Sequence, residues 1–182
     1  MKTLKLTFFF LILFIFLSCD EEKKLPKQDD KKVTVQPKEI DACSFLDKGE
    51  VEKIFNIEMK DPKKGRSQKG DANTASFSEC SFESDTADTK IYLSVYLRFT
   101  PFKDEYHATI QNVRNSFKQS GIEVTNIEGI GEVAFWGGNQ LHVFKGNNYY
   151  LIITLLGIKE SSEAIEKAKA VTLQAMRNLD SF

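Results

Sequence analysis

The clearest pattern in the chain is a strict alternation of apolar and polar positions over residues 91–99. The apolar positions are Ile91, Leu93, Val95, Leu97 and Phe99, and the positions between them are Tyr92, Ser94, Tyr96 and Arg98. A period of two is typical of a β-strand with one buried face. Cys80 and Phe82 alternate with polar neighbours in the same way, so a second strand is predicted around residues 77–83.

The strongest helical pattern follows directly. A long helix is predicted to open at Thr100 and Pro101, with the proline in the first helical position, and to stop at Gly121. Its apolar stripe, spaced three or four residues apart, consists of Phe102, Tyr106, Ile110, Val113 and Phe117.

Two further helices are predicted near the ends of the folded region. A short one follows Asp47, which has capping-box spacing to Glu50, and Asn56 is suited to close it in a left-handed conformation. The last one starts near Ser161. Its expected buried face consists of Ile165, Ala168, Thr172, Ala175, Met176 and Leu179.

Four more strands are predicted between the long helix and the last one. Residues 122–127 form the first, and residues 132–136, 140–145 and 149–156 form a three-strand meander. The two hairpin turns are Gly137-Gly138-Asn139 and Gly146-Asn147-Asn148. Residues 149–156 are apolar on both faces, so this strand is expected near the centre of the sheet.

The elements follow the order α-β-β-α-β-β-β-β-α, which predicts an α+β fold. We expect an antiparallel sheet of about 5–6 strands packed with three helices. A single domain is expected over residues 41–182. Residues 60–75 are expected to be a solvated basic loop or, alternatively, a contact for acidic headgroups or an acidic partner. The basic residues of this segment are Lys60, Lys63, Lys64, Arg66 and Lys69.

The start of the chain has the layout of a secretory signal peptide. Lys2 and Lys5 precede an apolar run over residues 8–17, and a small residue stands before Cys19. The run is shorter than the roughly 20 apolar residues of a spanning helix. Phe-Leu-Ser-Cys at residues 16–19 resembles the lipobox of bacterial lipoproteins, which implies a signal peptide over residues 1–18 and acylation of Cys19. An uncleaved anchor and a plain secretory signal with an incidental cysteine are the alternatives.

The segment after Cys19 is charged, poor in aromatics and broken by Pro26 and Pro37, a composition typical of disorder. Residues 19–40 are therefore expected to be a tether that attaches the domain to a membrane of the bacterial cell envelope. Asp-Glu-Glu at residues 20–22 resembles an export signal of surface lipoproteins in some bacteria, whereas an Asp at this position resembles an inner-membrane retention signal in others. The outer membrane or cell surface is favoured over the inner membrane, and ordinary solvating charge is the alternative interpretation.

The charge of the chain argues against one class of partner. Removing Lys2 and Lys5 from 25 basic residues leaves 23 against 26 acidic ones. A nucleic-acid-binding surface needs a basic surplus or a basic stripe. The sequence has neither, so we predict no nucleic-acid partner.

Two cysteines remain once Cys19 carries lipid. In an oxidising compartment, Cys43 and Cys80 are expected to form a disulfide, with two buried thiols as the alternative. A zinc site is disfavoured because the clustered Cys and His spacing that zinc needs is missing. We predict no metal and no cofactor.

The residues that usually carry catalysis are poorly placed. His107 falls on the solvated side of the long helix, and His142 lies mid-strand with no pattern that pairs it with a nucleophile or carboxylate. Gly129-Ile130-Gly131 lacks the third glycine of a dinucleotide loop and is expected to be a tight bend. We predict no catalytic residue.

Aromatic residues on the strands give a candidate binding face. If both hairpin turns are three-residue loops, residue 136 pairs with 140 and residue 145 with 149. One face then holds the core residues Val133, Phe135, Leu141, Val143, Leu151 and Ile153. The candidate binding residues are Tyr92, Tyr96, Arg98, Trp136, His142, Phe144 and Tyr150. An open face of this kind suits a glycan, a peptide or a lipid, whereas a covering helix would make it a second core.

Several short motifs resemble one protein family. Cys-Ser-Phe-Leu at residues 43–46 leads into Glu50-Val51, and Cys80 lies on an early strand. Gly-Ile-Gly-Glu-Val-Ala-Phe-Trp at residues 129–136 precedes Leu-His-Val-Phe-Lys-Gly at residues 141–146. Residues 43–179 resemble small bacterial lipoprotein domains of unknown function, best known from actinobacterial envelopes. The resemblance implies a PsbP-like α/β sandwich with a disulfide, and it implies no particular reaction.

Together these features predict a membrane-tethered, non-enzymatic envelope domain that binds another molecule or supports an assembly. Its expected partners are the membrane, through Cys19, and a protein, glycan or lipid ligand. One alternative is a hydrolase or transferase of envelope polymers that uses His142 and Arg98. Another is a carrier of lipids or other hydrophobes, which needs a cavity on the order of several hundred Å³.

Overall fold

The computed structural model describes residues 39–86, 90–102, 105–146 and 148–180. The predicted signal peptide, Cys19 and most of the predicted tether lie outside the described residues. The described residues form three α-helices, a short 3₁₀ turn and one seven-stranded antiparallel sheet. The predicted α+β class is confirmed, with more strands than the sequence indicated.

The elements run along the chain with few long connections. The helical elements are η1 (Ala42–Ser44), α1 (Lys48–Phe55), α2 (Glu105–Gln119) and α3 (Ser161–Asp180). The strands are β1 (Lys63–Gln68), β2 (Ser76–Glu83), β3 (Tyr92–Phe99), β4 (Thr125–Ile127), β5 (Val133–Gly137), β6 (Gln140–Lys145) and β7 (Tyr149–Leu156). The strand order is β1-β2-β3-β7-β6-β5-β4, so β7 lies at the centre as its apolar sequence predicts.

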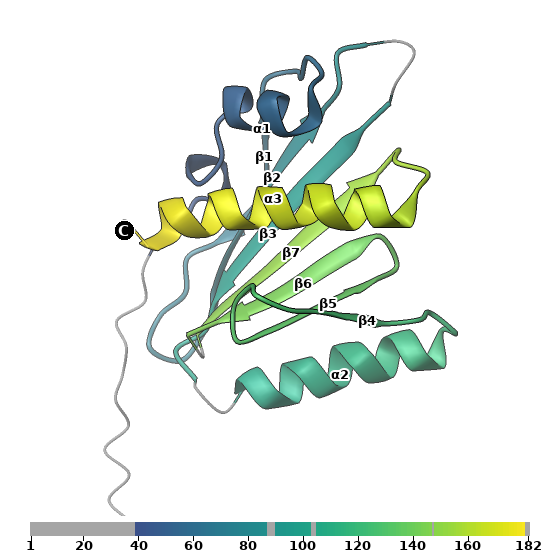
Figure 1. The fold of residues 1–182 in the computed structure, drawn as a ribbon. Helices are drawn as coiled ribbons and strands as arrows, with labels where there is room; N and C mark the ends of the chain where they lie inside the picture. Colours follow the sequence, from purple (N-terminus) through teal and green to yellow (C-terminus); the bar gives the residue numbers. More distant parts are fainter. Residues whose placement is uncertain (1–38, 87–89, 103–104, 147, 181–182) are drawn as a thin grey trace, which may run out of the picture. The chain divides into compact units, whose positions relative to one another are not determined.

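The two faces of the sheet are covered unequally (Figure 1). α3 crosses one face, and η1 and α1 pack on the same side to complete the main core. α2 covers the other face, where it packs against side chains of β5, β6 and β7. The strand alternation explains this division, because Phe144 faces α2 while its neighbour Val143 faces the main core.

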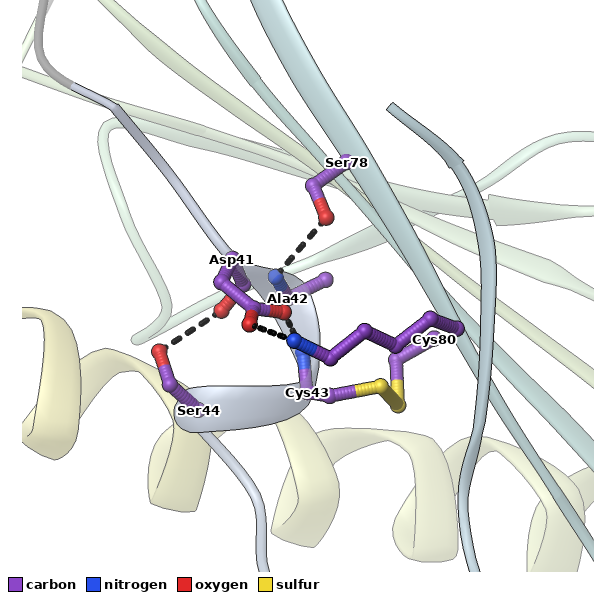
Figure 2. Close-up of a disulfide and its surroundings, with 7 residues drawn as sticks. Asp41, Ala42, Cys43, Ser44, Ser78 and Cys80 are labelled. Atoms are coloured by element: carbon purple, nitrogen blue, oxygen red, sulfur yellow. Dashed lines mark hydrogen bonds and ion pairs between the residues drawn. A yellow bond between two sulfur atoms is a disulfide. The ribbon is translucent and has the colours of Figure 1, made fainter. Parts of the chain in front are cut away.

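A disulfide joins the start of the domain to the sheet. Cys43 of η1 is bonded to Cys80 of β2, as predicted (Figure 2). The Ala42 N–H donates to Ser78 Oγ at 3.0 Å, and the Cys43 N–H donates to Asp41 Oδ1 at 3.0 Å. The chain therefore enters the domain through a segment that is bonded to β2 both covalently and by a hydrogen bond.

The predicted ends of α1 are confirmed. The Glu50 N–H donates to Asp47 Oδ1 at 2.7 Å, and the Asp47 N–H donates back to Glu50 Oε2 at 3.0 Å. Asn56 ends the helix in a left-handed conformation with φ 55°. The reciprocal hydrogen bonds satisfy backbone donors that a helix start leaves without intrahelical partners.

The predicted register of the first hairpin is wrong by one residue. Trp136 pairs with Leu141 and Gly137 with Gln140, so the turn contains two residues, Gly138 and Asn139. Both have positive φ values, 56° and 62°, as a two-residue hairpin turn requires. The shorter turn moves Trp136 into the main core, where 6% of it is exposed, and places Phe135 under α2. The second hairpin has the predicted pairing of Lys145 with Tyr149.

The predicted loop over residues 60–75 is also wrong, because it contains strand β1. Every residue of β1 is exposed, so the strand lacks the alternation that marks a half-buried one. It forms one edge of the sheet, and its pairing with β2 shifts between Lys64 and Ser67. Charged side chains and bulges of this kind protect an edge strand from pairing with other chains.

Two other predicted boundaries need correction. Pro101 precedes α2, because the Thr100 N–H donates to Asn148 O at 2.8 Å and prolongs the pairing of β3 with β7 past Phe99. β4 covers only the last part of the predicted strand, because the Ile122 N–H donates to Phe117 O at 2.9 Å and stays with the end of α2.

Candidate functional site

The candidate binding face predicted from the sequence is split into a covered and an open half. His142, Phe144 and Tyr150 lie in the covered half, beneath α2. Tyr92, Tyr96 and Arg98 all lie on β3. The side chains of β2 and β3 that point to this face are only partly buried or exposed. Trp136 belongs to neither half, because the corrected register turns it to the opposite face.

His142 is enclosed by aromatic rings and is only 3% exposed. Its ring stacks on Phe135 with 5.0 Å between centroids and meets the edge of Phe117 at 5.3 Å. Nδ1 lies 2.7 Å from the Tyr150 hydroxyl, whereas Nε2 has no hydrogen-bond partner among the described residues. Burial lowers the pKa of His142 to about 4, so the ring is neutral at physiological pH.

The two residues of the enzyme alternative are separated by a tyrosine. Arg98 pairs with Tyr150 across β3 and β7, and the Tyr150 hydroxyl in turn contacts His142. His107, the other histidine, is exposed on α2. The structure therefore does not bring Arg98 and either histidine together around a common space.

A shallow groove of about 500 Å³ lies in the open half, next to the start of α2. Its volume is within the range of small-molecule sites, roughly 300–1,000 Å³. It combines two residues of the predicted face with several that were not predicted from the sequence. The lining residues are Gln68, Asn73, Thr74, Ala75, Phe77, Tyr96, Arg98, Phe102 and Glu105.

Two aromatic rings from neighbouring strands lie in this groove. Phe77 of β2 and Tyr96 of β3 are stacked, with 5.9 Å between centroids and 26° between planes. Tyr96 also meets Tyr150 at 6.5 Å in an edge-to-face arrangement, so it connects the open and covered halves. Burial raises the pKa of Tyr96, which keeps its hydroxyl protonated and able to donate a hydrogen bond.

A charged network occupies the side of the groove next to α2. The Arg98 guanidinium donates to the Glu105 carboxylate, which also accepts a hydrogen bond from the Thr100 hydroxyl. Burial alone would raise the pKa of Glu105, but the hydrogen bonds from Thr100 and Arg98 hold it below its ordinary value. Glu105 is therefore ionised at neutral pH and balances the charge of Arg98.

The loop between β1 and β2 forms the opposite rim and is held by its own hydrogen bonds. The Gly70 N–H donates to Ser76 Oγ at 3.0 Å, and the Asp71 N–H donates to Thr74 Oγ1 at 3.0 Å. The Asn73 N–H donates to Asp71 Oδ1 at 2.7 Å. At Gly70 a Cβ atom would lie 2.4 Å from the Thr74 carbonyl oxygen, so the turn requires glycine.

Tyr92, at the other end of β3, lies outside this groove. It is 37% exposed and lines a separate hollow of about 340 Å³. That hollow also includes Lys60, Glu83 and Lys90. Tyr92 and Tyr96 thus share a strand and a face without sharing a site.

Tyr96 and Arg98 were predicted from the sequence, whereas the other groove residues were not. Phe77 stands at a polar position of the β2 alternation and is only partly buried, so an aromatic residue at such a position was the signal available in the sequence. Glu105 reaches the groove only because α2 starts beside the end of β3, which residue spacing does not reveal.

Within residues 39–180, leaving out the short gaps, no three His, Cys, Asp or Glu side chains gather in a way that holds a metal ion. None of the helices described in the structure is long and apolar enough to cross a membrane.

The resemblance to envelope lipoprotein domains stays a prediction. No family model, curated protein or solved structure matches this chain.

Proposed function

We propose that this chain is a bacterial envelope lipoprotein, tethered through an acylated Cys19, whose domain binds another molecule without catalysing a reaction. The observation that supports the binding role most is the open half of the second sheet face. Phe77 and Tyr96 keep exposed surface there and line a groove, although α2 covers the neighbouring aromatic residues. A partner that removes these rings from water gains free energy from their burial.

The catalytic alternative has less support. His142 lies under α2 with a lowered pKa, and the Arg98 guanidinium is paired with Glu105. A general acid or base must reach the proton that it transfers, and His142 is only 3% exposed.

The carrier alternative also has less support, because it needs a large cavity between the sheet and a helix. Beneath α3, the space lined by Val95, Leu151 and Leu179 has no room for a water-sized molecule. The main core is filled by side chains such as Leu97 and Ile153, which are at most 2% exposed.

Capture from envelope extracts of the parent bacterium tests the proposed function. The full-length chain is immobilised as wild type, as a Phe77→Ala, Tyr96→Ala double variant and as a Tyr92→Ala control. We expect wild type and control to retain the same partner and the double variant to lose it. Tyr92 suits the control because it is a partly exposed tyrosine on the same strand and face. Equal retention by all three proteins, each with a cooperative thermal transition, would reject the groove as the binding site.

A further inference from the structure

The charged side chains that line the groove, Arg98 and Glu105, form an ion pair. On the adjacent strands, Arg66 Nη2 lies 2.7 Å from Glu79 Oε1. An anionic ligand entering the groove would meet Arg98 already paired with Glu105, and the Glu105 carboxylate would repel it. A cationic ligand would likewise meet Glu105 already paired, and Arg98 would repel it. The charge distribution therefore favours a neutral ligand.

The stacked rings favour a ligand with a flat apolar side. Phe77 and Tyr96 both line the groove, and their ring planes are only 26° from parallel, so the two rings have nearly the same orientation. The face of an aromatic ring carries partial negative charge and attracts the weakly positive C–H groups of a ligand. A sugar ring has such C–H groups on one side and hydroxyl groups around its edge.

The groups around the rings are suited to hydroxyl partners. Gln68, Asn73 and Thr74 each offer a donor and an acceptor, while Arg98 offers further N–H donors and Glu105 further lone pairs. A hydroxyl both donates and accepts a hydrogen bond, so neighbouring hydroxyls match the paired groups of an amide, a guanidinium or a carboxylate.

The groove is also largely formed before a ligand arrives. Hydrogen bonds fix the Gly70–Thr74 turn, and the Arg98–Glu105–Thr100 network fixes the opposite side. Fixed groups lose little conformational entropy on binding, which matters for a small polar ligand that buries little apolar area.

From these properties we propose that the groove is a binding site for a neutral carbohydrate. One sugar ring lies against Phe77 and Tyr96. Its hydroxyls form hydrogen bonds with the Arg98–Glu105 pair on one side and with Asn73 on the other. This inference rests on the proposed function and narrows its ligand to one chemical class.

A glycan array followed by titration calorimetry tests the inference. The array carries neutral mono- to trisaccharides of glucose, galactose, mannose and N-acetylglucosamine, together with uronic-acid and sulfated counterparts. The probe protein is the full-length chain in a detergent without a sugar headgroup. We expect retention on neutral glycans and weaker retention on their anionic counterparts.

Three variants locate the site. Tyr96→Ala is expected to weaken the affinity for the best neutral glycan at least about tenfold, as removal of a central aromatic contact does. Asn73→Ala, a change at an exposed rim position, is expected to weaken it about threefold to tenfold through a lost hydrogen bond. Tyr92→Ala should stay within about twofold of wild type, because Tyr92 lines a different hollow. Asn73→Ala keeps the test decisive if Tyr96→Ala fails to fold.

Several results would overturn the inference. They are no retention of any neutral glycan, stronger retention of anionic glycans, or equal affinity in the Asn73→Ala and Tyr92→Ala variants. If no glycan binds while envelope capture still depends on Phe77 and Tyr96, the ligand class is wrong and the proposed function stands. If neither experiment depends on these rings, both are wrong.

Discussion

At the scale of single residues, His142 and Tyr150 form a polar pair inside the aromatic layer beneath α2. A buried polar group without a partner costs roughly 1–3 kcal/mol, and His142 Nε2 has no partner among the described residues. Protonation would add a charge in the same place, which is more costly again. His142 therefore links the stability of the domain to pH.

We predict that this histidine destabilises the domain as the pH falls from 7.5 to 4. The pKa of His142 is about 4 in the folded protein and ordinarily 6.5, so the unfolded chain takes up the proton first. The contribution of His142 to the free energy of unfolding is therefore fully present above about pH 6.5. It falls by roughly 3 kcal/mol as the pH is lowered to 4.

Urea unfolding at both pH values measures the effect. The matched comparison is the His142→Phe, Tyr150→Phe double variant, which keeps two rings and leaves neither polar partner behind. Between pH 7.5 and pH 4, the free energy of unfolding of the variant should fall by about 3 kcal/mol less than that of wild type. An equal loss in both proteins would show that His142 does not titrate in this way.

At the scale of elements, the sequence predicted best the strands that bury one face or both. The bounds of β6 and β7 match the prediction, and the alternation in residues 91–99 identifies β3. β1 was missed because both of its faces are exposed, so burial leaves no periodic pattern in it.

The site was predicted only in part, because local sequence patterns do not encode turn length or tertiary contacts. One turn residue more or less reverses the face of a strand, and the Gly138-Asn139 turn therefore removed Trp136 from the candidate site. Tyr96 and Arg98 were found by their position on an alternating strand. Phe77 and Glu105 join them through tertiary contacts between β2, β3 and α2, which local patterns do not contain.

We predict that the disulfide between η1 and β2 contributes substantially to stability. Its cysteines are 37 residues apart. A cross-link that closes a loop of this size stabilises a domain by about 3–4 kcal/mol in the chain-entropy model. The Cys43→Ala, Cys80→Ala double variant should lose about this much free energy of unfolding in urea.

Wild type treated with a thiol reductant under denaturing conditions should approach the stability of the variant, and the variant itself should not respond to the reductant. Equal stability of oxidised wild type and the double variant would contradict the prediction.

At the scale of the whole molecule, the groove lies close to the point where the chain enters the domain. The Ala42 N–H donates to Ser78 Oγ, next to Phe77 on β2. Lys69, which follows the groove residue Gln68 in the chain, has its Nζ 3.7 Å from Glu39 Oε2. The end of the proposed tether and the proposed binding site therefore share one end of β2.

The proposed tether makes its own prediction. Wild type should be recovered with membranes and show a mature N-terminus at Cys19 with the mass of attached acyl chains. Cys19→Ala should lose both the acyl mass and the membrane association, because the acyl chains that would anchor the protein are attached at this residue. Mass spectrometry and membrane fractionation measure these outcomes. An intact leader or an unmodified thiol at position 19 would refute lipid anchoring.

The link between Cys43 and Cys80 also determines how the domain responds to mechanical load. A pull on the chain before Asp41 reaches Cys43 within a few residues and passes through the sulfur bridge into β2. α1 and β1 lie between the two cysteines along the chain, so the load bypasses them. Once the disulfide is reduced, we expect the same pull to travel along the backbone and to detach η1, α1 and β1 from the domain in turn. The redox state of Cys43 and Cys80 would then determine whether edge strand β1 stays folded when the N-terminal end of the protein is pulled.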